Sequence, residues 1–198
     1  HMLQKDNRYK ILRIFFEDPS PKGIGFQLRE ISRKVAVAPP SVKKYLNELE
    51  KEQLIVKTKH RIHDYPVYYA NRDNEEFKFL KKIDTVIKIK ESGLIDYLLE
   101  NCMPDVIILF GSASKGEDLK ESDIDVFILS NKERIDITQF EKKLSRKINI
   151  FFSDNFNKLS KELRNNVING IILKGYLKVF WYGRINKSNP RQRESTIN

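Results

Sequence analysis

Cysteine is almost absent from the sequence, which contains only Cys102. One cysteine cannot form a disulfide within the chain, and this thiol lies in an apolar stretch, so we assign it a packing role. Long apolar runs are missing as well. The most apolar stretch, residues 106–110, is bounded by Asp105 and Gly111, whereas a membrane-spanning helix needs about 20 apolar residues. We therefore expect no membrane segment.

A secretory signal is also missing, because the N-terminal residues lack a basic segment followed by an apolar run and a cleavage site. This predicts a cytoplasmic protein. Acidic residues are few: 27 Asp and Glu stand against 37 Lys and Arg, which gives a net charge of +10. Such a charge attracts phosphate-bearing partners. A lysine-rich surface alone gives the same charge, so the net charge does not by itself indicate nucleic-acid binding. The positions of the basic residues in the fold must distinguish the two interpretations.

The N-terminal third contains three amphipathic segments and two β-rich ones. Apolar residues at helical spacing predict helices over 5–16, 27–34 and 38–49. Branched and aromatic residues predict strands over 54–58 and 66–70. The residues between these strands are polar and basic, so the two strands form a hairpin with a basic tip.

The third predicted helix has an apolar stripe that includes Val42 and Leu46. Its opposite face carries Ser41, Lys43, Lys44 and Asn47, and the hairpin tip carries Lys59 and Arg61. Three helices followed by a basic hairpin resemble the winged helix-turn-helix family, with residues 42–49 matching its recognition helix. The resemblance implies that the helix face contacts the major groove of double-stranded DNA and that the tip contacts phosphates or the minor groove. The alternative is a surface used for protein contacts or dimerisation.

Two connecting helices are predicted over 74–102, interrupted at Ser92-Gly93. In the first of them, helical spacing predicts one apolar side, formed by Phe77, Leu80, Ile83 and Ile87. Further along, residues 159–172 predict one or two helices and residues 177–181 a terminal strand. The last residues, 183–198, are polar and basic, and we expect a flexible tail there.

Residues 106–110 predict a buried strand that runs directly into Gly111 and Ser112. Glycine allows the backbone to approach a phosphate, and amides and a hydroxyl at a helix start supply hydrogen-bond donors. Asp123 and Asp125 begin the next apolar strand, where alternation places both carboxylates on one face. Paired carboxylates beside a phosphate-binding turn favour Mg²⁺-dependent phosphoryl or nucleotidyl transfer.

Gly111-Ser112, ten residues and then Asp123-Ile124-Asp125 resemble the DNA polymerase β-like nucleotidyltransferases, especially the minimal ones. The resemblance implies an α+β fold in which the winged helix-turn-helix is followed by a mixed sheet flanked by helices. It also implies that a nucleoside triphosphate binds at Gly111, Ser112, Lys115 and Ser122. Mg²⁺ or Mn²⁺ would be held by Asp123 and Asp125, and a nucleoside monophosphate would be transferred with release of pyrophosphate.

The third carboxylate of that family lies on a later strand, for which residues 147–152 are the match. Asn149 occupies the expected place, so Asp123, Asp125 and Asn149 form the predicted catalytic set. An amide can ligate a cation through its oxygen but is no useful base. Asp154, just past the strand, is the alternative third carboxylate, and Asp136 is interpreted as a cap or loop residue.

The predicted domains are residues 1–73, a winged helix-turn-helix; 74–102, connecting helices; and 103–182, the nucleotidyltransferase-like domain. The sequence does not identify the hydroxyl acceptor. By resemblance to minimal nucleotidyltransferases that act as antitoxins, it could be a HEPN-type partner protein. The competing hypothesis is a regulator whose nucleotidyltransferase fold only senses a nucleotide or a partner, and a homodimer is left open.

Overall fold

The computed structural model describes residues 6–19 and 24–179. Its N-terminal elements are α1 (Asn7–Glu17), α2 (Leu28–Val35), α3 (Pro39–Lys51), β1 (Ile55–Lys59) and β2 (Pro66–Ala70). The predicted three helices and hairpin are confirmed within a few residues. They enclose one apolar core in which Phe15, Ile31 and Leu46 are fully buried. Phe26 adds a short antiparallel bridge to Tyr68 beside the hairpin.

Two helices follow, α4 (Glu75–Ser92) and α5 (Leu94–Cys102). Helix α4 belongs to two cores, because Phe77 packs in the N-terminal cluster and Ile89 in a second one. The predicted apolar side of α4 is partly wrong. Ile83 is 36% exposed, whereas Lys81 and Asp84 are 2% and 3% exposed. The inward side of α4 meets charged groups of other elements, and these charged partners override the apolar periodicity.

The second core is built around a four-stranded mixed sheet with the order β5-β4-β3-β6. The strands are β3 (Val106–Phe110), β4 (Ile124–Leu129), β5 (Ile148–Ser153) and β6 (Ile171–Gly175), and the helices are α6 (Gly111–Lys115), α7 (Thr138–Leu144) and α8 (Lys161–Ile168), with a 3-10 turn η3 (Phe156–Lys158). Strand β3 runs antiparallel to β4 and β6, and β4 runs parallel to β5. The predicted α+β class with a mixed sheet agrees with this arrangement.

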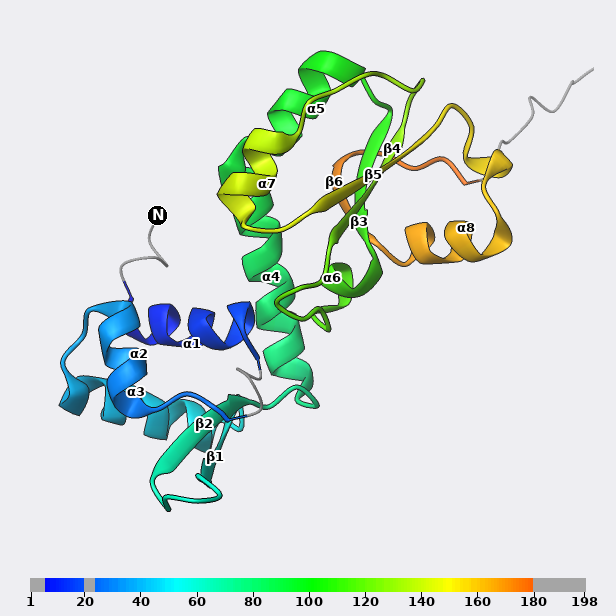
Figure 1. Cartoon of the computed structure of the whole chain (residues 1–198). Coiled ribbons are helices and arrows are strands. Elements are labelled where there is room, and N and C mark those ends of the chain that lie inside the picture. The colour runs from blue at the N-terminus through cyan, green and yellow to red at the C-terminus, as the bar shows by residue number, and fades with distance from the viewer. Residues whose placement is uncertain (1–5, 20–23, 180–198) are drawn as a thin grey trace, which may run out of the picture.

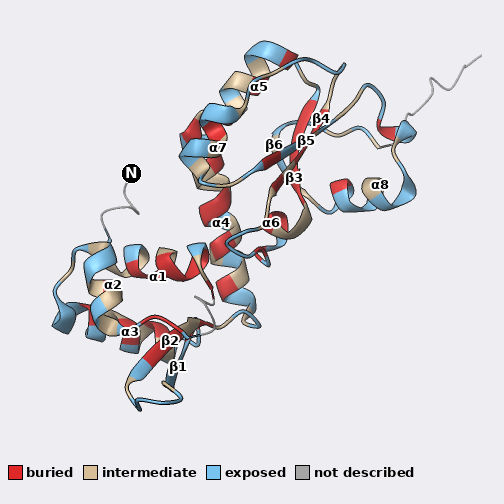
Figure 2. Cartoon of the chain, in the orientation of Figure 1, coloured by how far each residue is buried: buried red, intermediate tan, exposed pale blue. Residues whose placement is uncertain are grey.

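Helices cover both faces of the sheet. Helices α5, α7 and the end of α4 lie on one face and α8 on the other (Figure 1). The alternation of side chains along β3 matches these layers: Ile107 and Leu109 pack toward the first group, and Val106, Ile108 and Phe110 toward α8. All five are buried, as the burial colours in Figure 2 show, and β3 is one of the two inner strands of the sheet, between β4 and β6.

The C-terminal prediction needs correction. Residues 171 and 172, predicted within helices, instead begin β6, which pairs with β3. Residues 177–179 form no strand, and the remainder of the predicted terminal strand lies outside the described residues, as does the predicted tail 183–198. This segment is a strand because it pairs with β3, which is distant in the sequence, and local periodicity does not report such pairing. None of the described helices has the length and apolarity that crossing a bilayer requires.

Candidate functional site

Asp123, Asp125 and Asn149 converge at one edge of the sheet. In the parallel pair β4 and β5, Asp125 is the register partner of Asn149. The Asn149 Nδ2 donates to Oδ1 of Asp125 at 3.0 Å and to Oδ2 of Asp123 at 3.3 Å. Both aspartates are half-buried and Asn149 is exposed, so the cluster is open to solvent. The predicted juxtaposition of the three residues is therefore present.

Gly111 lies next to the Asp125 carboxylate of this cluster. Its φ of +73° is left-handed, and a Cβ atom built on it would collide with Oδ2 of Asp125. Only glycine avoids both problems, because it lacks the Cβ. The backbone at Gly111, where β3 passes into α6, thus lies directly against the Asp125 carboxylate.

The other predicted nucleotide-binding residues are less tightly grouped. Ser112 is half-buried in the first turn of α6, and Lys115 is exposed at the end of that helix. The Ser122 hydroxyl accepts a hydrogen bond from the Leu119 amide at 2.8 Å. Ser122 therefore has a structural contact in the loop before Asp123, which the sequence pattern does not predict.

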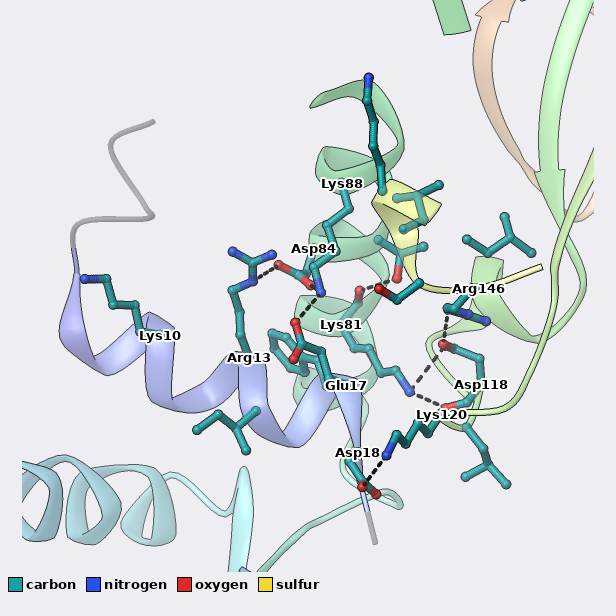
Figure 3. Close-up of a pocket in the computed structure, with 18 of the residues that line it drawn as sticks. Lys10, Arg13, Glu17, Asp18, Lys81, Asp84, Lys88, Asp118, Lys120 and Arg146 are labelled. Carbon is teal, nitrogen blue, oxygen red and sulfur yellow. Dashed lines mark hydrogen bonds and ion pairs between the residues drawn. The ribbon is translucent and has the colours of Figure 1, made fainter. Parts of the chain in front are cut away.

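Sequence reasoning missed a buried ionic cluster beside the site. Arg146 donates to Oδ2 of Asp118 at 2.8 Å, and Lys81 lies 3.3 Å from Oδ1 of the same carboxylate (Figure 3). Lys81 and Asp118 are each about 3% exposed. Burial lowers the pKa of Lys81 below its ordinary value, and the charge of Asp118 opposes that effect. No sequence spacing links residues so far apart in the chain, so only the fold reveals this cluster.

A cleft of about 950 Å³ lies between the N-terminal helices and the sheet unit, and its lining does not include the aspartate pair. Side chains of α1 and α4 and of the segments 118–120 and 143–146 line it, as Figure 3 shows. Many of its charges are already paired: Asp84 contacts Arg13 and Lys88 at 3.2 and 3.1 Å. The two carboxylates and the glycine turn meet instead at the Asp123 edge.

The predicted DNA-contacting residues are all exposed. Ser41, Lys43, Lys44 and Asn47 lie on the outer face of α3, and Lys59 and Arg61 lie at the end of β1 and in the hairpin turn. Helix α3 and the hairpin occupy the end of the molecule away from the sheet (Figure 1). The rings of His60, His63 and Tyr65 stack at the tip.

Residues 92–176 match the family model described as polymerase beta, nucleotidyltransferase. No curated protein matches the chain. The matched stretch starts at the last residue of α4 and ends just after β6, so it contains the whole sheet and the Asp123 edge. At this coarse level the chain carries a nucleotidyltransferase domain, which implies a nucleoside triphosphate as substrate. The N-terminal helices and hairpin lie outside the match.

The residues at the Asp123 edge fit a hard divalent cation. Two carboxylates and one amide present only oxygen ligands once the Asn149 amide is turned over, and oxygen ligands are those that Mg²⁺ prefers. Within the described part of the chain, no three His, Cys, Asp or Glu side chains group as a metal site. Because Asn149 is neutral, this set of ligands carries one negative charge fewer than a set of three carboxylates.

Asp154 cannot supply that missing charge. Because β4 and β5 are parallel and Asp125 pairs with Asn149, Asp154 lies past the opposite end of β5. It forms an ion pair with Lys158 at 2.7 Å, and this contact lowers the pKa of the Asp154 carboxyl. The Asp154 alternative is thus wrong. Asp136 accepts from the Thr138 amide at 3.0 Å in the loop before α7, whose N-cap is Ile137, so of the two readings given to Asp136 the loop residue is the one observed.

Proposed function

We propose that the protein is a DNA-binding nucleotidyltransferase, with nucleotidyl transfer at the Asp123 edge and duplex DNA bound by α3 and the hairpin. In this division residues 1–73 bind DNA, 74–102 connect, and 103–182 carry the transferase chemistry. The observation that carries the proposal is the convergence of Asp123, Asp125 and Asn149 above the glycine turn. The family match to residues 92–176 supports it.

In the proposed reaction an acceptor hydroxyl oxygen attacks the α-phosphorus of the triphosphate. The bond from that phosphorus to the bridging oxygen breaks, pyrophosphate leaves, and the hydroxyl proton passes to solvent or to a base of the acceptor. Asp123 and Asp125 would hold a divalent cation, Mg²⁺ or Mn²⁺, which would supply positive charge to the phosphate oxygens. Gly111 and Ser112 admit the triphosphate to the turn, and Lys115 and Ser122 border it.

Asn149 sets the rate in this proposal. Its amide fills the place next to both aspartates but has no basic group for the attacking hydroxyl. General bases contribute about 10² to 10⁴ in rate. The protein is accordingly a slow transferase, and its acceptor is a hydroxyl of a protein, a nucleic acid or a small molecule, with a HEPN-type partner among the protein candidates.

A regulator that only senses the nucleotide is the second candidate, and the hydrogen bonds of Asn149 favour it. An amide that donates to both carboxylates stabilises the aspartate pair without a cation. Such a protein would bind a triphosphate and alter its DNA or partner binding without turnover.

The experiment is incubation of the full chain with Mg²⁺ or Mn²⁺ and each triphosphate labelled at the α-phosphate. Label transfer or pyrophosphate release that disappears in Asp123→Asn with Asp125→Asn supports the transferase. Metal-dependent triphosphate binding without turnover supports the sensor. A triphosphate affinity that is unchanged by both substitutions would show that the nucleotide binds elsewhere. The matched control is Asp96→Asn with Asp105→Asn, which removes two carboxylates outside the site.

A further inference from the structure

The two aspartates are fixed in different ways. Asp125 lies within β4 and has register partners on both sides, Phe110 of β3 and Asn149 of β5. Asp123 precedes β4, which begins at Ile124. Strand pairing therefore sets the position of Asp125, whereas at Asp123 it reaches only the following peptide nitrogen, since the Ile124 amide donates to the Lys147 oxygen at 2.9 Å. A second contact holds the Asp123 carbonyl oxygen and the loop before it.

Arg146 makes that contact. Its guanidinium donates to the backbone oxygens of Ser122 at 2.7 Å and Asp123 at 3.1 Å, and to the Asp118 carboxylate at 2.8 Å. All three nitrogens of one planar group are used, and they bind both ends of the segment 118–123. Such a fork restricts the segment more than a single charge would.

The other end of this contact reaches α4. Lys81 donates to the backbone oxygen of Asp118 and forms an ion pair with its carboxylate. A Cβ atom at Gly116 would collide with the backbone of Lys78, so the loop lies directly on α4. Asp118 thus links Arg146 to Lys81 of α4, a helix outside the sheet.

We propose that Arg146, held by Asp118 and Lys81, is a positioning residue that places the Asp123 carboxylate for cation binding. This inference rests on the proposed function, since it assigns a purpose to the same aspartate pair. Without Arg146, the binding of a cation would have to order the backbone at Asp123. Ordering one residue weakens binding by roughly tenfold.

The sign of the effect separates positioning from charge. Arg146 is a cation near the aspartates, so its removal would strengthen the binding of another cation if charge alone mattered. Positioning predicts the opposite, a weaker affinity. Arg146→Lys sharpens the test, because it keeps the charge and loses the three-way fork.

The test measures Mn²⁺ binding to the full chain by electron paramagnetic resonance of free Mn²⁺, without nucleotide or acceptor. The variants are Arg146→Lys, Arg146→Ala and the control Lys147→Ala, which removes a neighbouring exposed cation. Each is also made in an Asp123→Asn background. Circular dichroism confirms the fold of each, and Arg146→Lys remains informative if Arg146→Ala does not fold, since it leaves Asp118 with a charged partner.

The expected result is a loss of about tenfold in Mn²⁺ affinity for Arg146→Lys, none for Lys147→Ala, and no further loss from Arg146→Lys once Asp123 is Asn. Wild-type affinity in Arg146→Lys, tighter binding in Arg146→Ala, or an equal loss in the Asp123→Asn background would each overturn the inference. Equal affinity of wild type and Asp123→Asn would instead reject the proposed metal site itself.

Discussion

At the scale of single residues, Gly111 is the most constrained position in the site. Its left-handed φ costs a residue with a Cβ about 1–2 kcal/mol, and its Cβ would also collide with the Asp125 carboxylate. We expect Gly111→Ala to lose that stability and also to weaken Mn²⁺ binding by about tenfold or more, because Asp125 is displaced. Mn²⁺ titration and thermal unfolding measure the two effects.

Gly93 provides the matched control for Gly111. Its φ is +84°, and its Cβ would meet only a ring atom of Phe140 at 3.9 Å. Gly93→Ala should therefore lose similar stability and bind Mn²⁺ as the wild type does. If both alanine variants bind equally well, the close approach at Gly111 has no part in cation binding.

Asn149 is the residue that separates a transferase from a sensor. Asn149→Asp supplies a third carboxylate of nearly equal volume, and we expect turnover to rise by about 10² or more while triphosphate affinity changes little. The measurement is transfer of the α-label to an acceptor, or release of pyrophosphate, under saturating triphosphate. Asn166→Asp, an exposed change on α8, controls for the added charge. A fast wild type that gains nothing from the change would contradict the role given to Asn149.

At the scale of elements, α3 carries the expected DNA contacts. Each lysine that neutralises a phosphate adds about one unit to the slope of log affinity against log salt. Lys43→Ala with Lys44→Ala should thus weaken duplex binding and flatten that slope by up to about two units, as measured by fluorescence anisotropy at several salt concentrations. The same loss from Lys142→Ala with Lys147→Ala, in the other unit, would show a nonspecific charge effect instead.

The contact of α1 with α4 depends on pH in a defined direction. The Tyr9 hydroxyl donates to Asp84 at 2.6 Å, and burial, followed by this carboxylate, raises the pKa of Tyr9 above its ordinary 10.0. A raised pKa means that the stabilisation is complete below pH 10 and is lost above it, by ~1.4 kcal/mol per pH unit while only the unfolded chain ionises.

Tyr9→Phe isolates this effect. We expect the wild type to be more stable than Tyr9→Phe by about 1 kcal/mol at pH 8, and this advantage to disappear near pH 11. Chemical denaturation at both pH values measures the difference in free energy of unfolding between the wild type and Tyr9→Phe. The titration of other groups affects both proteins equally and cancels in this difference. An advantage that stays constant between the two pH values would be inconsistent with the Tyr9 assignment.

At the scale of the whole molecule, local patterns predicted those elements whose partners are close in sequence. The N-terminal helices, the hairpin and β3 follow from periodicity and composition. Strand alternation predicted that the two aspartates share a face, and the family resemblance predicted Asn149 beside them, where it contacts both. Strand β6 was missed because its identity depends on pairing with a strand more than sixty residues earlier. The buried Lys81 was missed because its partner, Asp118, lies on another element.

Helix α4 is packed into both halves of the molecule, whereas a linker would only connect them. Phe77 near its start and Ile89 near its end pack in different cores, while Lys81 and Asp84 between them bind the Asp118 loop and α1. DNA and triphosphate are thus expected to be thermodynamically linked ligands. By the closure of the binding cycle, the factor by which triphosphate changes DNA affinity must equal the factor by which DNA changes triphosphate affinity. We expect a factor different from one in the wild type and closer to one in Lys81→Met, measured by titrating each ligand with the other saturating.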